Sequence, residues 1–260
     1  MTIKMGPNTT LLANINNILY KATLAPFVRI INKSKLLNKY CLPRRIVICG
    51  PPRTGTTLLN ECMKSFDNIS IIDYESPALR YPYLSLGKDF ILTKYPMDIL
   101  DIDNILTVYK NAWIIFMIRD PRDVIISKHY KEPDRYWVDF KEWNDSITIY
   151  ERMSEYDNKI LIRYEDLINA PNEVQNNIRE KLGLEKNYNF TDFFTHTTES
   201  HKDVKALSGV RPIDPNNTKK WTKDEHFDRI KQQLLNYPEL SDILVKYGYE
   251  KSNDWESLFK

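Results

Sequence analysis

The chain has 260 residues, which is enough to bury a sizeable core in one α/β domain. Hydrophobic residues make up 42% and charged residues 28% of it, and this composition excludes a disordered or fibrous protein. The 37 Lys and Arg nearly balance the 35 Asp and Glu, so the formal net charge of +2 argues against a nucleic-acid binder that acts through its overall field. Any anion site must be local.

The amino-terminal part is predicted to be helical, because apolar residues recur at helical spacing between residues 11 and 31. We expect this helix to pack on the domain, with a helix on a membrane surface as the alternative. No apolar stretch is long enough to span a membrane, and the amino terminus lacks the pattern of a secretory signal. Cys41, Cys49 and Cys62 form no CxxC pair and fit a reducing compartment, so we expect a cytoplasmic protein.

From Arg45 onward, short β-rich runs alternate with helical patterns, which is typical of a parallel sheet covered by helices. The predicted strands are 46–49, 69–72, 90–93, 113–118 and 160–163. The predicted helices are 56–65, 97–109, 122–130, 140–155, 172–181, 223–235 and 238–247. We expect one three-layer α/β domain over 1–260, made of a helical extension (1–44), a core (45–184) and a carboxyl-terminal loop with closing helices (185–260).

A phosphate-binding loop is predicted over residues 46–57, which run as strand, turn and helix. Gly50 and Gly55 stand at the two glycine positions of such a loop, where the backbone folds tightly and free amides point at an anion. A nucleotide triphosphatase needs a Lys directly after the second glycine, but here that residue is Thr56 and the positive charge is at Arg53. This weakens a kinase interpretation. The structural alternative is an ordinary glycine turn with an exposed Arg53.

A second anion site is predicted after the strand at 113–118. Pro121 suits the first turn of a helix, which would place Ser127 about two turns beyond the strand end. Arg119 and Ser127 would then hold one phosphate from two directions. The alternative is a capped helix start with a local ion pair.

Three segments resemble motifs of the sulfotransferase family that uses 3′-phosphoadenosine-5′-phosphosulfate (PAPS) as donor. GPPRTGTTLL at 50–59 looks like its 5′-phosphosulfate loop, and RDPRDVIIS at 119–127 looks like its 3′-phosphate motif. RYEDLINAP at 163–171 is similar to the segment whose Tyr, here Tyr164, approaches the adenine. The matches span roughly residues 45–221 and imply a P-loop NTPase-like sulfotransferase fold. The resemblance assigns donor binding to Pro52, Arg53, Thr54, Gly55, Thr56, Thr57, Arg119, Ser127, Tyr164 and Arg211.

Arg211 is assigned from a basic loop that closes over the donor in the family. GVRP at 209–212 is similar to the looser, bacterial-type form of this loop. Lys219 and Lys220 are the other candidates there, with solvated surface charge as the alternative.

Sulfonate transfer needs a base, positive charge around the transferring group and a stabilised leaving phosphate. Animal cytosolic members use a His after a strand, but the similar region here keeps Lys94 and has no His. Other members use a Glu near the strand that follows the phosphate loop, which implies Glu75, with Asp73 as the alternative. Such carboxylates at strand ends face the ligand crevice. We therefore expect Glu75, Lys94 and Arg53 to be catalytic.

The resemblance implies transfer of a sulfonate group from PAPS to a hydroxyl or amine of a small-molecule or carbohydrate acceptor. We expect the acceptor pocket at 76–87, 130–143 and 193–207. The four His have no metal-ligand spacing, so no metal is expected, and neither is a nucleic-acid partner. The alternatives are a P-loop small-molecule kinase and a catalytically silent nucleotide-binding protein of the same fold.

Overall fold

The computed structural model describes residues 44–80, 88–129, 132, 134–197 and 211–259. The predicted helix at 11–31 lies outside these residues, and so do two parts of the predicted acceptor pocket, 81–87 and 198–207. Among the described residues, no helix is both long and apolar enough to cross a membrane.

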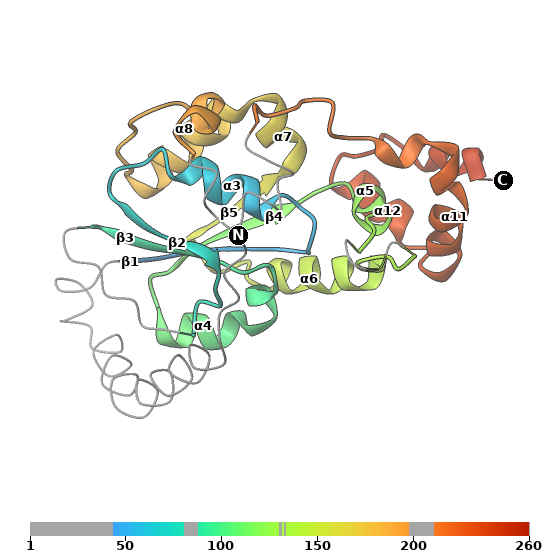
Figure 1. Cartoon of the computed structure of the whole chain (residues 1–260). Helices are drawn as coiled ribbons and strands as arrows, with labels where there is room; N and C mark the ends of the chain where they lie inside the picture. The colour runs from blue at the N-terminus through green and yellow to red at the C-terminus, as the bar shows by residue number, and fades with distance from the viewer. Residues whose placement is uncertain (1–43, 81–87, 130–131, 133, 198–210, 260) are drawn as a thin grey trace, which may run out of the picture.

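Within the described residues, five parallel strands form a single sheet with the order β2-β3-β1-β4-β5 (Figure 1). The strands are β1 (Arg44–Cys49), β2 (Ile69–Glu75), β3 (Phe90–Lys94), β4 (Trp113–Ile118) and β5 (Lys159–Arg163). All five predicted strands are confirmed, and the predicted ranges lie within the observed ones. Because β1 lies between β3 and β4, the strand order changes direction beside β1. In open parallel sheets, ligands bind at such a switch point, beyond the carboxyl ends of the strands.

Helices cover both faces of the sheet and produce three layers (Figure 1). One face carries α3 (Thr56–Met63), α7 (Tyr164–Asn169) and α8 (Pro171–Leu182), and the other carries η1 (Pro96–Asp101), α4 (Ile102–Val108) and α6 (Phe140–Arg152). Alternate strand residues serve the two layers: Val47 and Phe116 belong to one apolar cluster, and Ile46 and Met117 to the other. The predicted α/β fold with a helix-covered parallel sheet is therefore confirmed.

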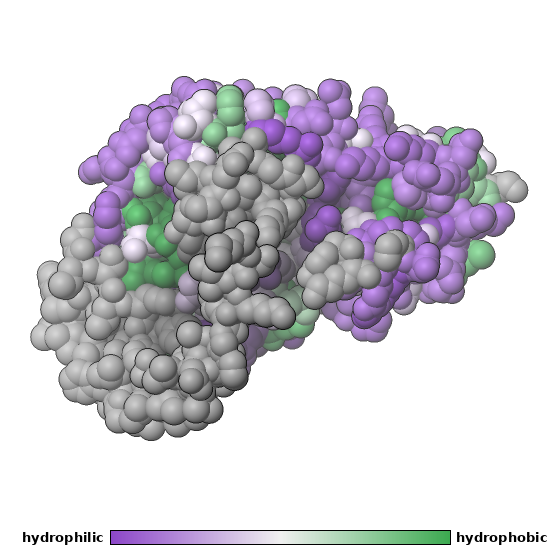
Figure 2. All heavy atoms as spheres, in the orientation of Figure 1, coloured by the Kyte–Doolittle hydropathy of each residue, from purple (hydrophilic) through white to green (hydrophobic). Residues whose placement is uncertain are grey.

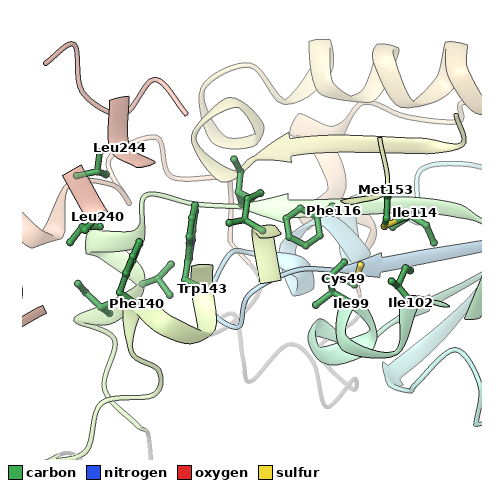
Figure 3. Packing of buried hydrophobic residues seen from close by; sticks show 14 of the residues in the cluster. Cys49, Ile99, Ile102, Ile114, Phe116, Phe140, Trp143, Met153, Leu240 and Leu244 are labelled. Carbon is green, nitrogen blue, oxygen red and sulfur yellow. The ribbon is translucent and has the colours of Figure 1, made fainter. Parts of the chain in front are cut away.

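The apolar cluster that contains Val47 and Phe116 extends along α6 to the carboxyl-terminal helices. Figure 3 shows Cys49, Ile114 and Phe116 from the strands near Ile99 and Ile102, with Phe140, Trp143, Leu240 and Leu244 continuing the core. The last part of the chain contains η3 (Lys220–Thr222), η4 (Asp224–His226), α11 (Phe227–Asn236), α12 (Leu240–Lys246) and η5 (Asn253–Phe259). On the face shown in Figure 2, hydrophilic residues cover most of the described surface.

The helix predicted over 122–130 is wrong beyond its first half, because α5 (Pro121–Ile125) ends early. The Trp137 amide donates to the Ser127 carbonyl, and Lys128 pairs with Tyr136 in an antiparallel bridge. The His129 amide, which would bond the Ile125 carbonyl in a longer helix, donates to the Arg135 carbonyl, and Arg229 Nε donates to the Ile125 carbonyl instead. The chain also forms α7, η2 (Phe190–Asp192) and α9 (Phe193–His196), which the sequence patterns did not predict.

Candidate active site

The loop between β1 and α3 has the shape predicted for an anion-binding turn. Gly50 has φ +141°, and a Cβ there would lie 2.2 Å from the Met117 carbonyl oxygen, so only glycine allows this close approach to β4. Arg53 also has a left-handed φ, 72°, which is uncommon for a residue with a side chain. The Thr54 hydroxyl donates to the Pro51 carbonyl over 2.7 Å and fixes the turn from inside. Pro52 is half-buried beside it.

Gly55 joins this loop to Tyr164, the first residue of α7. Gly55 caps α3 with φ +91°, and a Cβ there would lie 2.4 Å from Cδ2 of Tyr164. The aromatic ring therefore packs directly on the loop. Thr56 and Thr57 follow as the first two residues of α3, where free backbone amides gather at a helix start.

Arg119, which directly follows β4, is the third member of this group. Its guanidinium carbon lies 4.4 Å from the centre of the Tyr164 ring. Partial burial lowers the pKa of Arg53, and the nearby charge of Arg119 lowers it further. Two positive charges that are close enough to act on each other repel, unless an anion lies between or beside them. The structure thus brings Arg53, Gly55, Arg119 and Tyr164 together from three separate segments.

The carboxyl-terminal segment adds a cation that the sequence patterns left ambiguous. Partial burial lowers the pKa of Lys220, and the charges of Arg119 and Arg211 act in the same direction. Lys220 is therefore near Arg119 and does not behave as an isolated surface charge. Arg211 is exposed and contributes to the same positive region. In the sequence, the only feature that set Lys220 apart from a surface lysine was the adjacent Trp221, which is buried in the structure.

Ser127 is linked to this group through Asp123, and among the described residues it forms no hydrogen bond with Arg119. The Ser127 hydroxyl donates to the Asp123 carbonyl over 3.1 Å. The Asp123 carboxylate accepts from Arg119 Nη2 at 3.2 Å and from the Trp221 amide at 3.1 Å. Asp123 is buried and so connects α5, the end of β4 and the carboxyl-terminal segment.

Lys94, Glu75 and Thr57 meet at the carboxyl ends of β2 and β3. Lys94 Nζ lies 3.3 Å from Glu75 Oε1 and 3.3 Å from the Thr57 hydroxyl. A register shift in β2 between Ile71 and Glu75 makes Glu75 the strand neighbour of Lys94. The ammonium group is buried, whereas the Glu75 side chain is 53% exposed. The side chain of Asp73, the alternative base, lies outside what the structure describes.

These observations place groups from the ends of all five strands along one edge of the sheet. This edge carries the phosphate loop after β1, Glu75 ending β2, Lys94 ending β3, Arg119 after β4 and Tyr164 after β5. The arrangement offers positive charge at Arg53 and Arg119, an aromatic ring in contact with Gly55 and Arg119, and an accessible carboxylate. It can bind an extended anionic ligand and remove a proton from a neighbouring molecule.

Comparisons with known proteins agree with this geometry. Residues 79–188 match the family model described as the sulfotransferase family. No curated protein sequence matches the chain significantly.

Two solved structures have the same fold. The sulfotransferase domain from the Synechococcus PCC 7002 olefin synthase superposes with a TM-score of 0.51 at 18% identity, covering 69% of this chain and 86% of that one. The sulfotransferase from Alicyclobacillus acidocaldarius superposes with a TM-score of 0.50 at 11% identity, covering 77% and 95%. At these identities the likeness establishes the fold alone. The chain thus resembles the sulfotransferase family over residues 79–188 and has the fold of these two sulfotransferase structures.

Proposed function

We propose that this protein transfers a sulfonate group from PAPS to a hydroxyl or amine on a small-molecule or carbohydrate acceptor. The observation that carries the proposal is the contact of Tyr164 with both Gly55 of the phosphate loop and Arg119. PAPS has anionic groups at two ends of an adenosine, and in this site an aromatic ring contacts both the phosphate loop that carries Arg53 and the guanidinium of Arg119. The Glu75 and Lys94 pair also favours the bacterial-type members over those with a His base.

The two positive regions fit the two ends of the donor. At the 5′ end, we assign the phosphosulfate to Arg53 and to the loop that runs from Pro52 to Thr57, since backbone amides and hydroxyls at a helix start bind phosphate. Arg53 has no ion-pair partner within the part of the chain that is described, so its charge is available.

We assign the 3′-phosphate to Arg119 and Lys220, with Arg211 and Ser127 at its edge, and the adenine to Tyr164. These groups come from the core at 45–184 and the segment 185–260, which we propose act as one domain. A cytoplasmic location fits the free buried thiols of Cys49 and Cys62.

The proposed chemistry is an in-line displacement at sulfur. The acceptor oxygen or nitrogen forms a bond to sulfur while the bond from sulfur to the bridging phosphate oxygen breaks, which releases adenosine 3′,5′-bisphosphate (PAP). Glu75 takes the acceptor proton, because its carboxylate is accessible and is held at the strand ends 3.3 Å from Lys94 Nζ. Lys94 and Arg53 supply positive charge where negative charge develops on the leaving oxygen.

The test is transfer from sulfur-labelled PAPS across a panel of sugars, phenols, lipids and peptides, with wild type, Glu75→Gln and Arg53→Ala. Glu75→Gln keeps the size of the side chain but cannot accept the proton, so we expect turnover to fall by about 10²–10⁴ while PAP binding is nearly unchanged. Arg53→Ala should weaken both turnover and PAP binding.

Glu180→Gln is the matched control, because Glu180 is exposed on α8 away from the strand ends. It should behave as wild type. Full activity in Glu75→Gln would refute the base assignment, and wild type that labels no acceptor while binding PAP would favour a catalytically silent protein.

A further inference from the structure

Asn217 contacts two of the residues that we assign to the donor nucleotide. Its carbonyl oxygen accepts a hydrogen bond from Arg119 Nη2 over 2.9 Å. Its side-chain amide nitrogen donates to the Tyr164 hydroxyl oxygen over 2.5 Å. Asn217 is far from both in sequence, and no sequence pattern pointed to it. It is half-buried in the segment that precedes η3.

The segment around Asn217 is firmly attached to the core. Four residues later, the Trp221 amide donates to the buried Asp123 carboxylate, which also binds Arg119. The Trp221 ring lies 3.7 Å from the guanidinium carbon of Arg122 and is buried. Between Asn217 and Trp221, Lys219 has a left-handed φ of 54°, a conformation that persists only where surrounding contacts impose it. Asn217 is thus held at Tyr164 from its carboxyl-terminal side.

The direction of the Asn217 hydrogen bond determines whether the Tyr164 hydroxyl can donate a hydrogen bond to a ligand. The amide can only donate through its nitrogen, so the Tyr164 oxygen is the acceptor and its own proton remains available. Burial raises the pKa of Tyr164, which keeps that proton in place at neutral pH. The hydroxyl is therefore oriented as a donor toward a ligand acceptor atom, and purine ring nitrogens and phosphate oxygens are such atoms.

Building on the proposed function, we propose that Asn217 is a positioning residue for the donor nucleotide, which holds the Tyr164 hydroxyl and Arg119 in the arrangement that binds the 3′-phosphorylated adenosine. The contrary possibility is that Asn217 only fills the site before the nucleotide arrives and must leave when it binds. The two predict opposite effects of removing its side chain.

The experiment is calorimetric titration of the full chain with PAP, using Asn217→Ala, Tyr164→Phe and the double variant. Asn217→Ala removes the amide and keeps the carbonyl that Arg119 uses, so it isolates the contact with Tyr164. We expect about a fivefold to tenfold loss of PAP affinity, the size of one hydrogen bond. In the Tyr164→Phe background the same change should cost less than about twofold, because the group that it positions is already absent.

Two further variants sharpen the result. In Asn217→Asp, the carboxylate would accept a hydrogen bond from the Tyr164 hydroxyl, which reverses the direction of the bond. This variant should therefore weaken PAP binding more than Asn217→Ala. Asn216→Ala is the matched control, because the exposed side chain of Asn216 has no hydrogen bond in the described structure. It should bind PAP as wild type does, and thermal unfolding of all variants checks that they fold.

The outcomes separate this inference from the proposed function. Equal or tighter PAP binding by Asn217→Ala, or equal losses in both backgrounds, would overturn the positioning role while the proposed function stands. Wild type that binds no PAP would overturn both.

Discussion

At the scale of single residues, Asp98 links the two segments that carry Glu75 and Lys94. Asp98 lies in η1, shortly after β3, and its two carboxylate oxygens accept from the Ala78 amide at 3.0 and 3.3 Å. Ala78 follows Glu75 by three residues. Asp98 is 3% exposed, and burial raises its pKa from 3.8 to about 7, against the opposing hydrogen bond from Ala78. This carboxyl therefore holds together the segments after Glu75 and Lys94, and its burial opposes its ionisation.

The raised pKa of Asp98 predicts how stability depends on pH. The folded chain holds a proton on Asp98 that the unfolded chain releases above about pH 4, so ionisation opposes folding as the pH rises to about 7. The free energy of unfolding should therefore fall between these values. Denaturant unfolding of wild type and Asp98→Asn at about pH 5 and about pH 8 measures this, because the neutral amide removes the titration. If the free energy of unfolding changes equally with pH in the two proteins, Asp98 is not the group responsible.

At the scale of elements, the turn between β1 and α3 depends on a glycine that the Tyr164 ring covers. Gly55→Ala would place a Cβ 2.4 Å from the ring in a left-handed conformation, whereas Gly183→Ala would be left-handed with nothing within 4 Å. Gly183→Ala should therefore cost about 1–2 kcal/mol of unfolding free energy from backbone strain alone. Gly55→Ala should cost a further ~1–3 kcal/mol from overpacking, and it should also weaken PAP binding because the ring must move.

Denaturant titrations of the two glycine variants make this comparison directly. Equal losses of stability would mean that the Tyr164 ring moves aside without a measurable change in free energy. The close packing of this ring on the loop would then not contribute to stability.

The strands and the phosphate loop could be predicted because their signals are local. A run such as Trp113–Ile118 is apolar on both faces, and paired glycines follow a strand directly. The end of α5 could not be predicted, because the Ile125 carbonyl bonds to the distant Arg229 and the His129 amide bonds to Arg135. The contacts of Asn217 with Arg119 and Tyr164 span 98 and 53 residues, and no local pattern encodes them. Lys220 was visible as a candidate, but only its position close to the charges of Arg119 and Arg211 separates it from an ordinary surface lysine.

At the scale of the whole molecule, a nearly neutral chain concentrates positive charge at one edge of its sheet. The net charge is only +2, yet Arg53, Arg119, Arg211 and Lys220 come from separate segments to act on one another. Such a cluster is stable when an anion neutralises it, so its ligand should be recognised by charge at two points. Lys220→Ala should weaken PAP binding and Lys231→Ala, an exposed change on α11, should leave it unchanged.

The most direct measurement is a calorimetric titration of the full chain with PAP in one experiment and with ATP and Mg²⁺ in another. We predict saturable binding of PAP without Mg²⁺. We also predict that Mg²⁺ does not promote binding of ATP, because Thr56 stands where a kinase loop needs a lysine. Absence of PAP binding, or tighter binding of ATP with Mg²⁺ than of PAP, would contradict the proposed function.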